Sequence, residues 1–344
     1  MCVITFIGAG QMASAITFPA FENGNIVRLV GTPLDREIIK CLKKNDYHPT
    51  LKRVLHRGIE YYQIEDVQKA LNGADLVVCG VSSFGVEWFA NEILKLIPEN
   101  TPILAVTKGL MDMDDGTVLS YPAYWQSTSD GKKLCICGIG GPCTSYELAD
   151  HDHSFVKFCG SEYTALKKMK RILATDYYHI SLTEDVQGLE YAVALKNAYA
   201  LAVSLTIGLC EKNEGEGTLH YNSQAAAFTE AVWEMRHLLR LFCGNDQQLD
   251  FGAGDLYVTI FGGRTRKLGI LLGRGFSMDA ALEKLNGVTL ESVVITKRMS
   301  RAISRLSETG KARKSDYPLL FHVYEVLEGG EKADLPWKCF ERDQ

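Results

Sequence analysis

A lysine in an otherwise apolar stretch is the first residue of chemical interest in this sequence. Lys196 lies in Glu190-Tyr191-Ala192-Val193-Ala194-Leu195-Lys196-Asn197-Ala198-Tyr199, where apolar residues occupy nearly every helical face. A charged side chain in such a stretch is paired, reaches out to solvent, or has a function. Burial lowers the pKa of a lysine side chain toward the range that is useful for proton transfer. Lys196 is therefore a candidate general acid or base, and a structural salt bridge is the alternative.

Two further charged residues have a context that suggests chemistry. Asp255 lies in Phe251-Gly252-Ala253-Gly254-Asp255-Leu256-Tyr257-Val258-Thr259, where the glycines indicate close packing of backbone or substrate. A helix N-cap is the alternative role for this aspartate. Lys108 follows the apolar run 103–106, at the predicted carboxyl end of a buried strand. Ligands bind at that end in open α/β sheets, although a lysine can also stand at a strand exit without one.

A glycine- and arginine-rich segment follows Asp255. It runs Gly262-Gly263-Arg264-Thr265-Arg266-Lys267-Leu268-Gly269 and enters a predicted helix. Arg264 and the N–H groups of the helix start are suited to holding a phosphate. A solvated basic loop is the alternative.

The N-terminus carries a motif typical of dinucleotide-binding sites. Gly8-Ala9-Gly10-Gln11-Met12-Ala13 follows the first predicted strand directly and opens a helix. Gly8 and Gly10 allow a tight turn and let backbone N–H groups approach a pyrophosphate, while the small Ala13 permits close helix–strand packing. Glycines after strands also make plain tight turns, but the strand–turn–helix context favours a nicotinamide dinucleotide.

The residues near the predicted adenosine end leave the type of dinucleotide open. A carboxylate about 20 residues beyond the glycines favours NAD. Here the tip of the second strand carries Thr32, and Arg36 is suited to a 2′-phosphate, so NADP is slightly favoured over NAD. Asp35 and Arg36 equally match an ordinary helix start.

Other reactive side chains give weaker signals. His151 and His153 form an H-D-H pair with no second group of metal ligands, and we predict no metal site. Cys143 follows Gly141 and Pro142 at a predicted strand exit and is placed to touch a ligand, but no histidine is positioned to activate it. The ten cysteines suggest reduced thiols in a cytoplasmic protein.

The pattern of elements predicts two domains. Apolar runs predict strands, and helical spacing in the first half predicts helices between them. The predicted strands are 2–7, 26–30, 76–81, 103–106, 134–139, 155–158 and 178–182, and the predicted helices are 12–21, 35–43, 86–96 and 162–173. Such alternation predicts a doubly wound α/β sheet, and the long helical patterns 189–209, 223–242, 278–285 and 290–306 predict an all-α domain after it. We place the boundary at 1–185 and 186–344 and expect the site in a cleft between the domains.

Composition narrows the class of protein. The chain has 344 residues, of which 46% are hydrophobic and 23% charged, with a formal net charge of -5. This excludes a wholly disordered or fibrous protein and disfavours nucleic-acid binding. The N-terminus lacks the charged start of a signal peptide, and the apolar run 193–210 carries Lys196 and Asn197, which favours a buried helix over a membrane span.

Taken together and in order, these segments resemble the NAD(P)-dependent glycerol-3-phosphate dehydrogenase family, and archaeal-type members most. The matching pieces are the glycine motif, Thr107-Lys108-Gly109-Leu110, Gly140-Gly141-Pro142, Glu190, Ala194-Leu195-Lys196-Asn197, Asn222 and Ala225, Gly254-Asp255-Leu256, Thr259, Arg264 and Glu291. Each piece is short, and their specificity lies in the ordered set.

The resemblance implies a Rossmann-like domain, a helical substrate domain and roles for named residues. Lys196 would protonate the carbonyl oxygen of dihydroxyacetone phosphate, with Asp255 as its charge partner, and Lys108 would orient the substrate. The expected substrate contacts are Lys108, Asn197, Thr259, Arg264 and Thr265. The expected cofactor contacts are Gly8, Ala9, Gly10, Gln11, Met12, Thr32, Arg36, Ser82, Lys108, Gly141, Cys143, Ser145, Arg264 and Glu291. A homodimer is usual in the family, and the expected partner is a small phosphorylated substrate, not nucleic acid or a membrane.

Departures from the family pattern leave the substrate open. Gly263-Arg264-Thr265 replaces the usual Ser-Arg-Asn, Leu290-Glu291-Ser292 replaces Val-Glu-Gly, Cys143 replaces a small or hydroxyl residue, and Glu230 stands where a basic residue is common. Dihydroxyacetone phosphate is the leading substrate. The alternatives are another phosphorylated ketose or polyol, a hydroxy acid, or a dinucleotide-binding protein without turnover.

Overall fold

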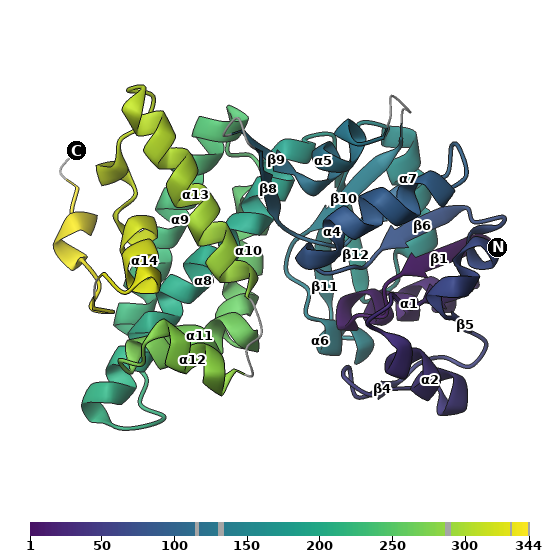
Figure 1. The fold of residues 1–344 in the computed structure, drawn as a ribbon, viewed down its shortest axis with the longest axis horizontal. Helices are drawn as coiled ribbons and strands as arrows, with labels where there is room; N and C mark the ends of the chain where they lie inside the picture. Colours follow the sequence, from purple (N-terminus) through teal and green to yellow (C-terminus); the bar gives the residue numbers. More distant parts are fainter. Residues whose placement is uncertain (114–116, 130–133, 286–289, 331, 343–344) are drawn as a thin grey trace. The chain divides into compact units, whose positions relative to one another are not determined.

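The computed structural model describes residues 1–113, 117–129, 134–285, 290–330 and 332–342. The chain divides into two compact units (Figure 1). Unit 1 comprises Met1–Lys108 and Ser120–Glu190, and unit 2 comprises Gly109–Leu119 and Tyr191–Gln344. Each unit therefore contains two separate stretches of the chain.

Unit 1 is built on an eight-stranded sheet. In spatial order its strands are β12 (Tyr178–Thr183), β11 (Ser154–Cys159), β10 (Ile136–Gly140), β7 (Ile103–Ala105), β6 (Leu76–Cys79), β1 (Val3–Ile7), β2 (Ile26–Val30) and β5 (Glu60–Tyr62). All neighbours pair in parallel except β10 and β11. The chain leaves β1 toward β2 and later returns to β6 on its other side. This change of direction creates the topological switch point at which such sheets bind ligands.

Seven helices of unit 1 are described, and most of them connect these strands. They are α1 (Gln11–Glu22), α2 (Arg36–Asn45), α3 (Val67–Leu71), α4 (Val86–Trp88), α5 (Tyr121–Ser127), α6 (Ser145–Ala149) and α7 (Tyr163–Leu173). Leu76, Val78 and Leu104 of the central strands are fully buried in one apolar core with residues of α1, α6 and α7. A short hairpin, β3 (Tyr47–His48) and β4 (Arg53–Val54), follows α2.

The predicted α/β class is confirmed, with two differences in the sheet. The antiparallel pairing of β10 with β11 makes the sheet mixed, whereas right-handed parallel units were expected. The edge strand β5 was not predicted, because its sequence Glu60-Tyr61-Tyr62 lacks the apolar run of a strand buried on both faces.

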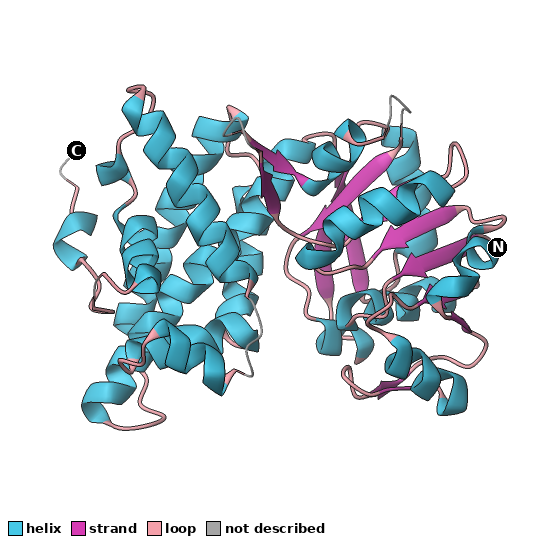
Figure 2. Cartoon of the chain, viewed as in Figure 1, coloured by secondary structure: helices cyan, strands magenta, loops and turns pink. Residues whose placement is uncertain are grey.

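Unit 2 is mainly helical (Figure 2). Its helices are α8 (Val186–Glu214, beginning in unit 1), α9 (Tyr221–Cys243), α10 (Leu249–Ile260), α11 (Gly263–Gly273), α12 (Met278–Lys284), α13 (Glu291–Glu308) and α14 (Pro318–Glu328). The hairpin of β8 (Leu110–Asp112) and β9 (Val118–Ser120) is held to α13, since the Arg298 guanidinium bonds the Leu110 carbonyl and lies 2.6 Å from the Asp112 carboxylate.

Helix α8 is the core of unit 2. It is long and apolar enough to cross a membrane by length and composition, but 89% of its most apolar window is buried inside the protein. Helix α11 packs against it at van der Waals distance: a Cβ on Gly273 would lie 2.3 Å from the Leu205 carbonyl oxygen, and one on Gly269 would lie 2.4 Å from Ser204 Cβ. The apolar run is therefore a core helix, as the sequence favoured.

Candidate active site

The glycine turn after β1 is packed so tightly that side chains cannot enter it. Gly8 has a φ of +102°, and a Cβ there would lie 2.8 Å from the Gly80 carbonyl oxygen at the exit of β6. A Cβ on Gly80 would lie 2.2 Å from Ala13 Cβ in α1. Helix α1 begins after Gly10, which has no side chain to occupy the N–H groups of the first turn. This cradle, which an added Cβ would fill, fits the pyrophosphate of a dinucleotide.

Two side chains hold the middle residue of the turn. The Ala9 N–H donates to Asp35 Oδ2 at 3.1 Å, and Asp35 also accepts from the Thr32 N–H and hydroxyl. Nδ1 of the buried His48 accepts from the Leu51 N–H, so Nε2 carries the proton and donates to the Ala9 carbonyl at 2.9 Å. Burial lowers the pKa of His48 and favours this neutral form. Neither tether could be predicted from the sequence, because neither residue adjoins the motif.

The other predicted adenosine contacts lie at the exit of β2. Asp35 precedes α2, but its side chain bonds Ala9 and Thr32 and does not cap the helix. Arg36 is the first residue of α2, and its exposed guanidinium pairs with Glu65. A 2′-phosphate at this position would therefore compete with Glu65 for Arg36.

The carboxyl ends of β7 and β10 bring several predicted residues together. Lys108 Nζ donates to the Gly141 carbonyl at 3.3 Å, and the two residues line a small hollow with Met12 and Cys143. The Thr107 hydroxyl donates to the Val81 carbonyl at 2.6 Å and joins the exits of β7 and β6. Of the remaining predicted contacts in unit 1, Ser82 follows the exit of β6 and Ser145 begins α6.

A buried carboxyl group lies beside this cluster and received no role from the sequence. Glu190 is 1% exposed, and its Oε1 lies 4.0 Å from Cys159 Sγ. Among the described residues Oε2 has no hydrogen-bond partner. Burial raises the pKa of Glu190 to about 8, although the positive charge of Lys108 acts in the opposite direction.

In unit 2 the structure pairs the two residues that sequence analysis put first. Lys196 of α8 and Asp255 of α10 are 59 positions apart, and Nζ lies 2.5 Å from Oδ1. The Lys196 side chain is 12% exposed and that of Asp255 is 1% exposed. Asp255 lies inside α10, so the N-cap alternative is wrong. The helices approach closely at Gly252, where a Cβ would lie 2.9 Å from the Ala192 carbonyl oxygen.

The predicted phosphate contacts surround the end of α10 and the start of α11. The Thr259 hydroxyl donates to the Asp255 carbonyl one turn earlier, at 2.6 Å. The Gly/Arg segment is helical from Gly263 onward and is not a loop, but Arg264 and Lys267 are exposed, so its binding of a phosphate stays a prediction. Arg264 and Thr265 occupy the first turn of α11 after Gly262, which has no side chain to occupy its N–H groups. An exposed arginine at an uncapped helix start is suited to a phosphate.

Two more predicted contacts, and one departure from the family pattern, also lie in unit 2. Asn197 is buried next to Lys196 on α8, and Glu291 is the first residue of α13. Glu230 of α9 is buried and bonded through both oxygens to Arg342, at 2.5 and 2.7 Å. Its charge is therefore compensated by a residue near the C-terminus, to which the sequence had assigned no role.

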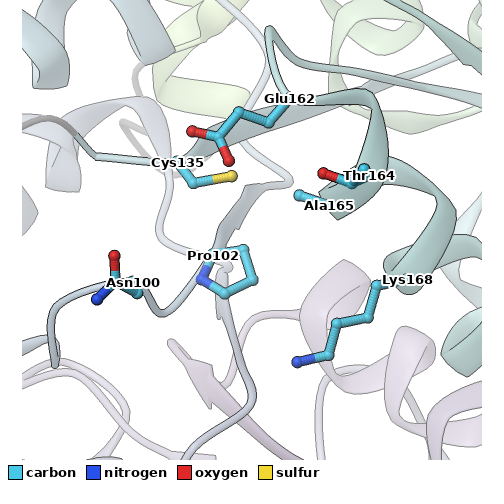
Figure 3. Close-up of a pocket in the computed structure, with 7 residues that line it drawn as sticks. All are labelled: Asn100, Pro102, Cys135, Glu162, Thr164, Ala165 and Lys168. Atoms are coloured by element: carbon cyan, nitrogen blue, oxygen red, sulfur yellow. The ribbon is translucent and has the colours of Figure 1, made fainter.

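One cavity of unit 1 lies away from these residues. It has a volume of about 300 Å³ and adjoins the amino ends of β7 and β10 (Figure 3). Its lining residues are Asn100, Pro102, Cys135, Glu162, Thr164, Ala165 and Lys168. Lys168 Nζ lies 3.4 Å from the Asp75 carboxylate, and no predicted site residue is among the described lining residues. This cavity therefore lies at the end of the sheet opposite to Lys108 and Gly141.

Comparisons with known proteins match both units. A family model described as the NAD-dependent glycerol-3-phosphate dehydrogenase N-terminus matches residues 3–162, and the model of the C-terminus matches residues 185–337. The NADP(+)-dependent glycerol-3-phosphate dehydrogenase of Archaeoglobus fulgidus is 33% identical, covering 96% of this chain and 97% of the relative. The glycerol-3-phosphate dehydrogenase [NAD(P)+] of Bacillus pumilus is 28% identical, covering 96% and 91%.

Solved structures agree on the fold. The glycerol-3-phosphate dehydrogenase of Plasmodium falciparum superposes with a TM-score of 0.83 at 19% identity, covering 100% of this chain and 96% of the other. The glycerol-3-phosphate dehydrogenase of Coxiella burnetii superposes with a TM-score of 0.80 at 21% identity, covering 98% of this chain and 97% of the other. At such identities the likeness is one of architecture.

Proposed function

Because the chain belongs to the NAD-dependent glycerol-3-phosphate dehydrogenase family, we propose that it interconverts dihydroxyacetone phosphate and sn-glycerol 3-phosphate, with bound NAD(P) accepting or supplying the hydride. Membership makes the chain an NAD(P)-dependent oxidoreductase. The observation that carries the proposed reaction is the Lys196–Asp255 pair, a charged group that the apolar helix α8 holds beside a buried carboxylate.

Residues of unit 1 would hold the cofactor. The turn from Gly8 to Gln11 would bind the pyrophosphate through backbone N–H groups, and the tethers to Ala9 fix its conformation before binding. Arg36 and Thr32 would face the adenosine end. Lys108, fixed by the Gly141 carbonyl, would contact the cofactor and orient the substrate.

Lys196 would move the proton. In the reducing direction Nζ donates a proton to the carbonyl oxygen at C2 as negative charge develops there, and in the oxidising direction it takes the proton back. Asp255 holds the ammonium group at 2.5 Å and balances its charge in a nearly water-free setting. The same pair is a salt bridge that also contributes to the stability of the fold. Activity and stability of its variants must therefore be measured separately.

The phosphate of the substrate would lie near the first turn of α11. Arg264, Thr265 and the N–H groups of that turn would bind it, with Asn197 and Thr259 nearer the proton donor. Gly263 is exposed and has a φ of +84°; apart from its chain neighbours and its own helix backbone, no heavy atom of the described residues lies within 4 Å of where its Cβ would be. This space, where the family usually has a serine, favours a larger ketose phosphate as the second candidate substrate.

The test of the acid/base role compares two lysines of α8. We expect Lys196→Met to lower kcat by about 10²- to 10⁴-fold while NADPH binding, measured by fluorescence titration, is retained. Lys212→Met changes an exposed lysine of the same helix and should leave kcat unchanged. Full activity of Lys196→Met would overturn the role of Lys196.

The substrate is tested by NADPH and NADH oxidation with dihydroxyacetone phosphate beside a panel of larger ketose phosphates. A higher kcat/KM for dihydroxyacetone phosphate supports the proposed reaction. Preference for a larger ketose phosphate would favour the second candidate. Binding of NADPH without turnover of any carbonyl compound would contradict both and indicate a dinucleotide-binding protein.

A further inference from the structure

Outside the residues discussed so far, a thiol, a carboxylate and an imidazole meet where α8 ends and α9 begins. Cys210 and Glu214 lie one turn apart on α8, and His220 immediately precedes α9. Their ligand atoms all lie within 4.8 Å of one another, and His220 Nε2 is 3.0 Å from Glu214 Oε2. We propose that Cys210, Glu214 and His220 form a binding site for zinc or a similar thiophilic divalent cation.

The loop that carries His220 is fixed by contacts that do not involve these three side chains. Glu211 accepts from the Gly217 N–H at 3.1 Å and from Arg274 at 2.8 Å, and Arg274 also bonds Glu216 at 2.8 Å. Gly215 and Gly217 have φ values of +106° and +86°, which permit the chain to turn back toward α8. These contacts therefore hold the backbone before His220 close to α8 in advance, so that binding has to order mainly the His220 and Glu214 side chains.

The donor set indicates the class of cation. Thiolate, imidazole and carboxylate are the ligands that zinc takes in proteins, whereas magnesium and calcium take oxygen ligands. Zinc–ligand bonds of about 2.0 to 2.3 Å in a tetrahedral shell place two donors about 3.3 to 3.8 Å apart. Any pair of the three donor atoms that lies near the 4.8 Å limit would therefore draw together by about 1 Å on binding. One thiolate and one carboxylate balance the charge of a divalent cation, and a water molecule completes a tetrahedral shell.

The surroundings of the Cys210 thiol favour its protonated form, so a cation must displace a proton when it binds. Cys210 is buried, and burial together with the nearby Glu214 charge raises the pKa of its thiol, although the His220 backbone N–H acts in the opposite direction. The cation would bind the thiolate and release its proton to solvent. Sequence analysis passed over this group because the spacing Cys-x₃-Glu-x₅-His is not one of the familiar zinc motifs.

The test is a titration of the chelator-treated full-length protein with Co²⁺, whose tetrahedral thiolate complexes absorb in the near ultraviolet and the visible. We expect one equivalent to bind with a thiolate-to-cobalt band that Zn²⁺ displaces. Cys210→Ser should abolish the band, and His220→Gln should weaken Co²⁺ binding at least about tenfold. Cys339→Ser, at an exposed cysteine, and His237→Gln, at a histidine of α9, should bind as the unchanged protein does.

Two results would overturn the site: no thiolate band in the unchanged protein, or a band that persists in Cys210→Ser. His220 is exposed, so His220→Gln tests the site even if Cys210→Ser does not fold. Zn²⁺ should also raise the Tm of the unchanged protein more than that of His220→Gln, because a cation bound only to the folded state stabilises it. Equal shifts in both would contradict the proposal.

Discussion

The two units position their candidate site residues in different ways. In unit 1 the important features belong to the backbone, such as the left-handed turn at Gly8 and the carbonyl that holds Lys108. In unit 2 they belong to side chains, above all the Lys196–Asp255 pair held by two packed helices. A site made of backbone is sensitive to added atoms, whereas a site made of paired charges is sensitive to removal of one partner.

The difference follows from the chemistry that each unit is suited to. A pyrophosphate is recognised by N–H groups, which every residue has, so the sequence requirement is for space and conformation. Proton transfer requires a titratable side chain, and its burial requires a counter-charge.

The largest expected effect comes from removing one charge of the pair. Asp255→Asn leaves the Lys196 ammonium without its counter-charge, and we expect a loss of about 3 to 5 kcal/mol in the free energy of unfolding, with loss of activity. The double change Lys196→Met with Asp255→Leu replaces both charges by apolar groups and should recover most of that stability without recovering kcat. Urea denaturation and initial rates give the two readouts. Equal instability of the single and double variants would show that the charge is not the cause.

Adding one methyl group should break the backbone-built part of the site. Gly8→Ala places a Cβ 2.8 Å from the Gly80 carbonyl oxygen in addition to the strain of a φ of +102°, and we expect NADPH affinity to fall about ten- to hundredfold. Gly24→Ala is the matched control, since Gly24 has a φ of +73° with no heavy atom of the described residues within 4 Å of a Cβ. Gly24→Ala should lower the stability of the protein but leave its affinity for NADPH unchanged. If both variants bind NADPH equally well, crowding at Gly8 does not matter.

The fold could be predicted where the sequence carried a strong periodic or apolar signal. The runs of β1 and β6 are buried almost throughout, β2 is buried at Val27, Leu29 and Val30, and the helices α9 and α13 have clear helical spacing. Helix α10 was missed because Gly252 and Gly254 lower helix propensity, yet Gly252 is what lets α10 approach α8. Glycines that serve the packing of two helices therefore weaken the sequence signal of the helix that contains them.

The sequence pointed to candidate site residues but not to the contacts that hold them. Lys196 and Asp255 each stood out locally, while their pairing across 59 positions came only from the family resemblance. The Asp35 and His48 tethers to Ala9 carry no motif, and Glu190 was visible only as a member of the segment around Lys196. Contacts of this kind depend on tertiary packing, which no spacing in the sequence encodes.

Glu190 extends the contrast to pH. It lies on α8, as Lys196 does, but its Oε2 has no hydrogen-bond partner among the residues that the structure describes. Its pKa is raised from 4.5 to about 8, so between these values the folded state keeps a proton that the unfolded state has released. Stability should therefore fall as the pH rises through this window, by about 1.4 kcal/mol for each unit of pKa difference that is realised.

Glu190→Gln should remove this pH dependence. We expect the variant to become more stable than the unchanged protein as the pH rises from about 5 to about 8. These limits lie near the pKa of Glu190 in the unfolded and in the folded state, and no further gain is expected above them. Urea denaturation at several pH values measures it. Glu92→Gln, at an exposed carboxylate, is the control and should run parallel to the unchanged protein. A parallel curve for Glu190→Gln would mean that Glu190 is already ionised at low pH.

The smallest expected effect concerns the choice between NADP and NAD. Arg36 is engaged by Glu65, so a 2′-phosphate must displace that carboxylate before the guanidinium can bind it. Glu65→Gln should lower the KM for NADPH by about two- to fivefold, in keeping with the small energy of an exposed ion pair, and leave the KM for NADH unchanged. Glu37→Gln, which breaks the exposed pair with Lys40 on the same helix, should change neither. Equal changes in the KM values for NADPH and NADH would show that Arg36 does not contact the 2′-phosphate. The cofactor site of unit 1 would then not depend on this exposed side chain.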